Sequence, residues 1–76
     1  MSDVTKELDT TGLNCPMPIL RAKKALKELQ VGEVLRITAT DPGSVKDFEA
    51  FAKQTGNELL ESTTEGDTFI YKLKKA

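Results

Sequence analysis

The sequence contains no histidine and no tryptophan, and it has one tyrosine and a single cysteine, Cys15. Without histidine a Cys–His catalytic pair cannot form, and the commonest nitrogen ligand of structural zinc sites is missing. A lone cysteine can neither close an intramolecular disulfide nor serve as a dithiol redox centre. These absences exclude peptidase, dithiol oxidoreductase and zinc-finger chemistry, and we expect no metal and no organic cofactor.

Long apolar runs and a strong net charge are absent as well. No stretch approaches the roughly 18 apolar residues of a membrane-spanning helix, and residues 1–7 lack the apolar segment of a signal peptide. A formal net charge of −1, with few aromatic residues on which bases could stack, gives no general attraction to nucleic acid. We therefore expect a cytoplasmic protein with a reduced thiol, and neither nucleic acid nor a membrane as a direct partner.

The length of 76 residues fits one small domain, which we place at residues 1–76. The content of 38% hydrophobic and 30% charged residues is typical of a soluble globular domain. A chain this short buries a smaller fraction of its surface than a larger protein does. We therefore expect a monomer without a deep, enclosed active site.

Apolar periodicity and turn residues divide the chain into six elements in the order β-α-β-α-β-β. The predicted strands are residues 4–9, 34–40, 58–62 and 68–73, and the predicted helices are residues 16–29 and the segment between the N-cap Ser44 and the stop Gly56, with Gly32 as the stop of the first helix. Each strand–helix–strand unit implies a right-handed parallel crossover, and the closing hairpin adds an antiparallel strand. The sequence thus predicts an α+β fold: a two-layer α/β sandwich with a mixed four-stranded sheet and both helices on one face.

Cys15 lies in the tetrapeptide Cys15-Pro16-Met17-Pro18, directly before the amphipathic helix. Unpaired N–H groups and the macrodipole at a helix N-terminus favour an anion, so we predict a thiol pKa below the usual value of about 8.5. A lone cysteine is also often a small buried hydrophobe, and proline is common in a first helical turn for geometric reasons alone. Cys15 precedes Ile19, the first residue of the apolar stripe of the helix, and this position favours a protruding thiol that Pro16 and Pro18 hold in place.

Such a thiol can accept a group from one protein and hand it to another, or it can sense oxidation by pairing with an external thiol. A persulfide suits the first role and needs no bound cofactor. Four basic residues follow in the same helix, Arg21, Lys23, Lys24 and Lys27. They form either a solvated helix face or a docking surface for an acidic partner.

The sequence Leu8-Asp9-Thr10-Thr11-Gly12-Leu13-Asn14-Cys15-Pro16-Met17-Pro18 precedes an amphipathic helix, Gly32-Glu33, a β-rich strand and Asp41-Pro42. From about residue 8 to residue 74, this pattern resembles the TusA/SirA-like sulfur carrier proteins. The resemblance implies a two-layer sandwich similar to the C-terminal domain of a translation initiation factor. It also implies a transient persulfide on Cys15, with Pro16 and Pro18 setting the helix start and Arg21, Lys23 and Lys27 facing the partner.

The resemblance implies a relay in which a cysteine desulfurase or a rhodanese loads the carrier and a downstream sulfurtransferase complex unloads it. The product of such relays is the 2-thiouridine of tRNA, molybdenum cofactor sulfur, or an intermediate of sulfur oxidation. The carrier would act as a protein substrate, with no turnover beyond transfer from Cys15. Two alternatives stay open: a protein- or nucleic-acid-binding module with an incidental cysteine, and a thiol-based redox sensor.

Overall fold

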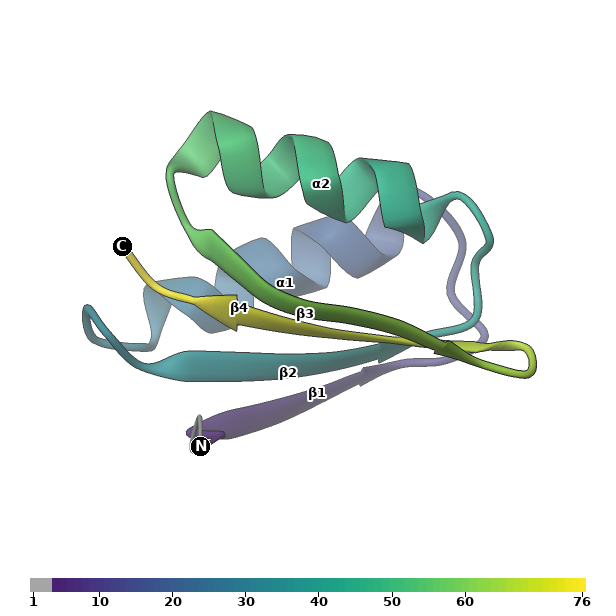
Figure 1. The fold of residues 1–76 in the computed structure, drawn as a ribbon, viewed down its shortest axis with the longest axis horizontal. Helices are drawn as coiled ribbons and strands as arrows, with labels where there is room; N and C mark the ends of the chain where they lie inside the picture. Colours follow the sequence, from purple (N-terminus) through teal and green to yellow (C-terminus); the bar gives the residue numbers. More distant parts are fainter. Residues whose placement is uncertain (1–3) are drawn as a thin grey trace.

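The computed structural model describes residues 4–76 and has the predicted element order. Its elements are β1 (Lys6–Thr10), α1 (Met17–Lys27), β2 (Val34–Ala39), α2 (Ser44–Thr55), β3 (Glu58–Glu65) and β4 (Thr68–Lys74) (Figure 1). Two predictions, the domain at residues 1–76 and the lack of a signal peptide in residues 1–7, include residues 1–3, which lie outside the described residues. Neither helix within residues 4–76 has the length and apolar character needed to cross a membrane.

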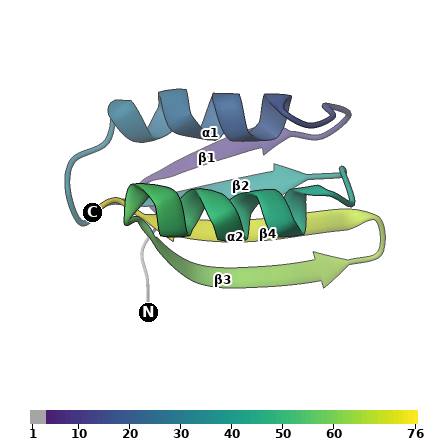
Figure 2. The ribbon, with the colours of Figure 1, turned by 90° about the horizontal axis from the view of Figure 1, so that it is seen from above.

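The four strands form one mixed sheet in the order β1-β2-β4-β3. β1 and β2 are parallel, whereas β4 is antiparallel to both of its neighbours, β2 and β3. The final strand of the hairpin is therefore inserted between β2 and β3, which run in the same direction. Both helices cover one face of this sheet (Figures 1 and 2). The predicted α+β sandwich, with its mixed sheet and its helices on one face, is confirmed.

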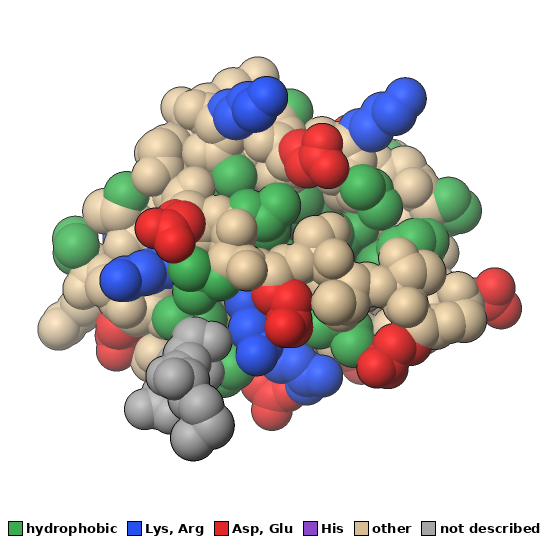
Figure 3. Space-filling model, viewed as in Figure 1, with side chains coloured by type: hydrophobic (Ala, Val, Ile, Leu, Met, Phe, Trp, Pro, Cys, Tyr) green, Lys and Arg blue, Asp and Glu red, His purple; other side chains and the backbone are tan. Residues whose placement is uncertain are grey.

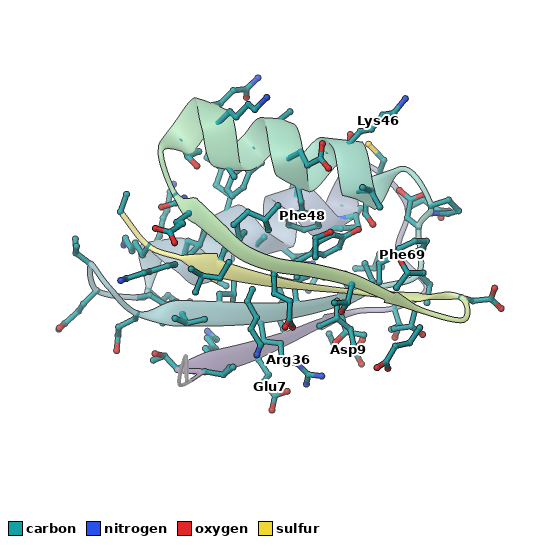
Figure 4. All side chains as sticks on the ribbon, viewed as in Figure 1. Glu7, Asp9, Arg36, Lys46, Phe48 and Phe69 are labelled. Carbon is teal, nitrogen blue, oxygen red and sulfur yellow. The ribbon has the colours of Figure 1, made fainter. Side chains whose placement is uncertain are left out.

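The core lies between the sheet and the two helices. Fully buried side chains come from β2 (Leu35, Ile37), β4 (Tyr71, Leu73) and α2 (Phe48), and the apolar face of α1 packs against them. Phe48 points from α2 toward the sheet (Figure 4), where its ring stacks on Tyr71 at a centroid distance of 4.6 Å. Burial of such a side chain contributes about 1.5–3 kcal/mol, so these residues dominate the stability of the fold.

The other face of the sheet carries mostly polar side chains, and Figure 4 shows Glu7, Asp9 and Arg36 on the side away from the helices. Across the four strands, Glu7, Arg36, Lys72 and Glu61 form one row. Arg36 pairs with Glu7 at 2.7 Å, and Lys72 pairs with Glu61 at 3.7 Å. Exposed ion pairs contribute at most about 1 kcal/mol each to stability, but their charged groups keep this uncovered face of the sheet hydrated.

The first helix is shorter than predicted, because α1 ends at Lys27 and its C-cap is Glu28. The N–H groups of Glu28 and Leu29 bond to carbonyls three residues earlier, so the last turn tightens before the chain leaves the helix. Gly32, predicted as the helix stop, instead belongs to the turn before β2 and has a φ of +91°. The predicted stop was placed four residues too late because Leu29 remains buried and extends the apolar pattern.

The second helix begins differently from the prediction. Ser44 is not the N-cap but the first helical residue, while Gly43 occupies the cap position without a side-chain hydrogen bond. The Ser44 hydroxyl is buried and shares a hydrogen bond of 2.7 Å with the Tyr71 hydroxyl. The predicted end is confirmed: Gly56 adopts a left-handed conformation with a φ of +76° and donates its N–H to the carbonyl of Ala52.

Candidate functional site

Cys15 lies in the connection between β1 and α1, at the carboxyl end of β1. Because β1 and β2 are parallel, the connection from β2 to α2 leaves the sheet at the same end, as Figure 1 shows. Two hydrogen bonds join these connections: the N–H of Gly12 donates to Thr40 Oγ1 at 2.8 Å, and the N–H of Cys15 donates to Asp41 Oδ2 at 3.0 Å. The backbone of the thiol residue is therefore fixed against the start of α2.

The Asp41 side chain links two parts of this end of the molecule. While its Oδ2 accepts the N–H of Cys15, its Oδ1 accepts the N–H of Gly43 at 3.2 Å, one residue before α2. A single carboxylate thus connects the thiol loop to the N-terminus of the second helix.

The thiol of Cys15 is exposed, which rules out the alternative of a small buried hydrophobe. It borders a shallow hollow of about 260 Å³ between α1 and α2, lined by Cys15, Pro16 and Ile19 on one side and by Asp47, Ala50, Phe51 and Gln54 of α2 on the other. This open setting agrees with the expectation that no deep active site exists in so small a domain. A thiol at such a rim can be reached by a group carried on another macromolecule.

The two prolines mark the start of α1, as the sequence predicted. Pro16 occupies the N-cap position and follows a cis peptide bond, and Pro18 lies in the first turn, where its ring is fully buried. The N–H of Met17 donates to the carbonyl of Asn14 at 2.9 Å. Pro18 therefore anchors the first turn in the core while Cys15, three residues earlier, remains exposed.

The predicted lowering of the thiol pKa is wrong. Two prolines without an N–H and a Met17 N–H already bonded leave this helix terminus with few donors for an anion. The Asp47 carboxylate accepts a hydrogen bond from the thiol and raises the pKa of Cys15, and partial desolvation and the negative charges of Asp47 and Asp41 raise it further. The thiol of the unpartnered protein is therefore neutral at physiological pH.

Asp41 and Asp47 are the residues of this site that sequence reasoning missed. Asp41 belongs to the Asp41-Pro42-Gly43 turn that ends the predicted strand 34–40, and Asp47 follows Ser44 by three residues, so neither position by itself indicates a contact with Cys15. A usable signal existed, because the predicted parallel strands place the connections after them at one end of the sheet. Acidic residues in the second connection could thus have been expected near Cys15.

The basic residues of α1 are all exposed, but they do not form a single cluster. Lys23 and Lys27 line a second hollow of about 170 Å³, together with Leu26, Phe51, Thr55, Asn57 and Lys75. Phe51 borders both this hollow and the one beside Cys15. Arg21 lies elsewhere on the helix surface, one turn after the exposed side chain of Met17 and directly after the exposed Leu20. The groove between the helices thus has the thiol at one end and two lysines at the other.

Comparison with known proteins identifies the family, since the family model described as sulfurtransferase TusA matches residues 6–75. The chain belongs to the TusA family. The sulfur carrier protein TusA of Allochromatium vinosum is 63% identical over 76 residues, covering all of both chains. A putative sulfur carrier protein of Neisseria meningitidis is 54% identical over 65 residues, covering 86% of this chain and 88% of that one.

A solved structure agrees with this assignment. The crystal structure of a SirA-like protein from Desulfitobacterium hafniense superposes with a TM-score of 0.80 at 27% identity, covering 91% of this chain and 95% of that chain. The resemblance to TusA/SirA-like proteins is therefore confirmed, and TusA family membership supports a sulfur carrier role.

A third hollow of this TusA-family chain lies away from the thiol, on the opposite side of α2. It measures about 430 Å³ and is lined by Glu49, Ala52, Lys53, Gly56, Asn57 and Leu59. Figure 3 shows the face on which α2 and β3 lie in front, with hydrophobic side chains visible between them and with charges of both signs around them. This hollow is lined by no thiol, so the candidate sulfur chemistry stays with Cys15.

Proposed function

We propose that the protein is a sulfur carrier that holds sulfane sulfur as a persulfide on Cys15. The observation that carries the proposal is the free, exposed thiol of Cys15 at the rim of an open hollow, in a chain of the TusA family. Cys15 provides the only thiol in the lining of the hollow, so the site is suited to holding and passing on sulfur. The whole chain then acts as one carrier domain and as a protein substrate in a relay.

The transfer is a sulfane exchange without net oxidation. Cys15 attacks the outer sulfur of a donor persulfide anion; a new S–S bond to Cys15 forms as the S–S bond of the donor breaks. The proton of the Cys15 thiol ends on the released donor thiolate, and the persulfide on Cys15 carries the negative charge. Unloading repeats the same exchange with an acceptor thiol, so neither a metal nor an organic cofactor is required.

The donor in this proposal is a cysteine desulfurase or a rhodanese, and the acceptor is a downstream sulfurtransferase. Arg21, Lys23 and Lys27 are the proposed partner-facing residues, since all three are exposed on the helix that follows Cys15. Their charge would steer an acidic partner surface toward the thiol. The proposal covers sulfur supply to tRNA 2-thiouridine, to the molybdenum cofactor and to sulfur oxidation, and the identity of the acceptor protein distinguishes these three.

Loading with purified donor enzymes tests the proposal. Incubation with a cysteine desulfurase and cysteine should add the mass of one sulfur atom to the intact protein, and Cys15→Ser should gain none. Dithiothreitol should remove the added mass. A wild-type protein left unmodified by every desulfurase and rhodanese of its host would refute the carrier role.

The two alternatives predict different behaviour. If the fold were a binding module with an incidental cysteine, Cys15→Ala would leave the cellular phenotype intact while the double change Lys23→Glu and Lys27→Glu would abolish it. A redox sensor would instead form a mixed disulfide under oxidant. The carrier proposal requires Cys15→Ala to abolish the phenotype without any oxidant being present.

A further inference from the structure

Two carboxylates, from the β2–α2 connection and from the first turn of α2, lie near Cys15. Asp41, in the β2–α2 connection, binds the backbone N–H of Cys15, and Asp47, in the first turn of α2, lines the hollow that the thiol borders. Asp47 is the one charged residue among those that line this hollow, and the first turn of α1 contributes no acidic residue. Asp47 thus lies across the hollow from the thiol, Asp41 holds the backbone of Cys15, and no basic side chain lines the hollow.

Unloaded and loaded carrier interact differently with these carboxylates. In the unloaded carrier the thiol keeps its proton, because the Asp47 carboxylate, which lines the same hollow, raises the pKa of Cys15 through hydrogen bonding and through its negative charge. In a persulfide the inner sulfur carries no hydrogen, so loading itself removes this hydrogen bond. The outer sulfur, about 2 Å farther along the side chain, is an anion near neutral pH and is repelled by Asp47 and Asp41.

We propose that Asp47 is a positioning residue that biases Cys15 toward its sulfur-free state, so that the loaded carrier gives up its sulfur readily when it meets an acceptor thiol. Asp41 supports this function by fixing the backbone of Cys15 beside α2. The inference rests on the proposed carrier function and deepens it, because it assigns the direction of transfer to a residue outside the Cys-Pro-Met-Pro motif. A carrier that held its persulfide tightly would stop the relay.

A partner can cancel this bias. A lysine or arginine of a donor enzyme, placed over the rim of the hollow, would neutralise Asp47 and favour the loaded form during docking. On dissociation the negative charge of Asp47 would again destabilise the persulfide.

The experiment compares wild type with Asp47→Asn and with the matched control Glu49→Gln. Glu49 lies on the same helix but points to the opposite side, where it lines the separate hollow of about 430 Å³. Glu49→Gln therefore changes the net charge by the same amount as Asp47→Asn without altering the environment of the thiol. Each protein is equilibrated with glutathione persulfide and glutathione at a fixed ratio, and the loaded fraction is measured by intact mass. The rate of thiol alkylation against pH is measured on the unloaded proteins.

In Asp47→Asn, the ratio of loaded to unloaded carrier should rise roughly fivefold, the effect of one unit charge a few ångströms away in water. The midpoint of its alkylation profile should move to lower pH, and Glu49→Gln should match wild type in both assays. Equal loading of wild type and Asp47→Asn would overturn the inference while leaving the carrier function intact. Absence of loading in wild type would overturn the carrier function and the inference with it.

Discussion

Replacing Tyr71 with phenylalanine removes one oxygen atom from the core and tests the hydrogen bond that joins β4 to the start of α2. Tyr71 and Ser44 are 0% and 1% exposed, and their hydroxyls lie 2.7 Å apart. In Tyr71→Phe the ring still stacks on Phe48, but the buried Ser44 hydroxyl loses its partner. An unsatisfied buried hydroxyl costs about 1–3 kcal/mol, so we expect a loss of about 1–2 kcal/mol.

A double-mutant cycle isolates this interaction. Ser44→Ala leaves the Tyr71 hydroxyl unpaired and should cost a similar amount, whereas the combination of both changes removes both polar groups. The double variant should therefore be more stable than the sum of the single losses implies, by about 1 kcal/mol.

The measurement is urea unfolding followed by far-ultraviolet circular dichroism, because the chain has no tryptophan and Tyr71 is its only tyrosine. For a domain of this size each kcal/mol also lowers Tm by roughly 4–8 °C. Strictly additive losses, or a Tyr71→Phe variant as stable as wild type, would refute the assignment of this buried hydrogen bond.

Two further outcomes follow from the core and from the end of α2. Burial raises the pKa of the Tyr71 phenol above 10.0. The folded state then holds the phenol proton more tightly than the unfolded state does. The contribution of this proton to stability is complete below about pH 10 and is lost as pH rises through the raised pKa. Between about pH 9 and 11, the urea midpoint should therefore fall less steeply in Tyr71→Phe than in wild type. Gly56→Ala should lower stability by about 1–2 kcal/mol in the same urea assay, since its φ of +76° disfavours a Cβ atom even though the surrounding space is open. Gly43→Ala, at a φ of −73° with Asp41 at an ordinary contact distance of 3.7 Å, should be near neutral; equal losses at both glycines would contradict the backbone argument.

The fold could be predicted because its signals are local. Leu35, Ile37 and Ala39 alternate with polar residues and are all fully buried in β2, and the apolar spacing of both helices matches the faces that pack on the sheet. The predicted helix boundaries were less accurate where one residue type suits two different positions at the helix end. Ser44 suits an N-cap and a first helical residue equally, and only its contact with Tyr71, 27 residues away, distinguishes the two.

The site was predicted in position but not in electrostatics. Cys15 could be singled out from the motif and from the absence of any second cysteine or histidine. Its pKa depends on Asp41 and Asp47, which are 26 and 32 residues away and reach the thiol only through the pairing of β1 with β2. A local rule about helix termini could not include carboxylates that tertiary structure supplies, and Pro16 and Pro18 removed the donors on which that rule depends.

The central place of β4 has a consequence for how the chain is made. β3 joins the sheet through β4 alone, and β4 also pairs with β2. While a ribosome has synthesised only the residues before Thr68, β1 and β2 can pair and α2 can pack against α1, but β3 has no strand with which to pair. The four-stranded sheet therefore cannot be completed stepwise from the N-terminus, and it closes only after residues 68–74 have left the ribosome.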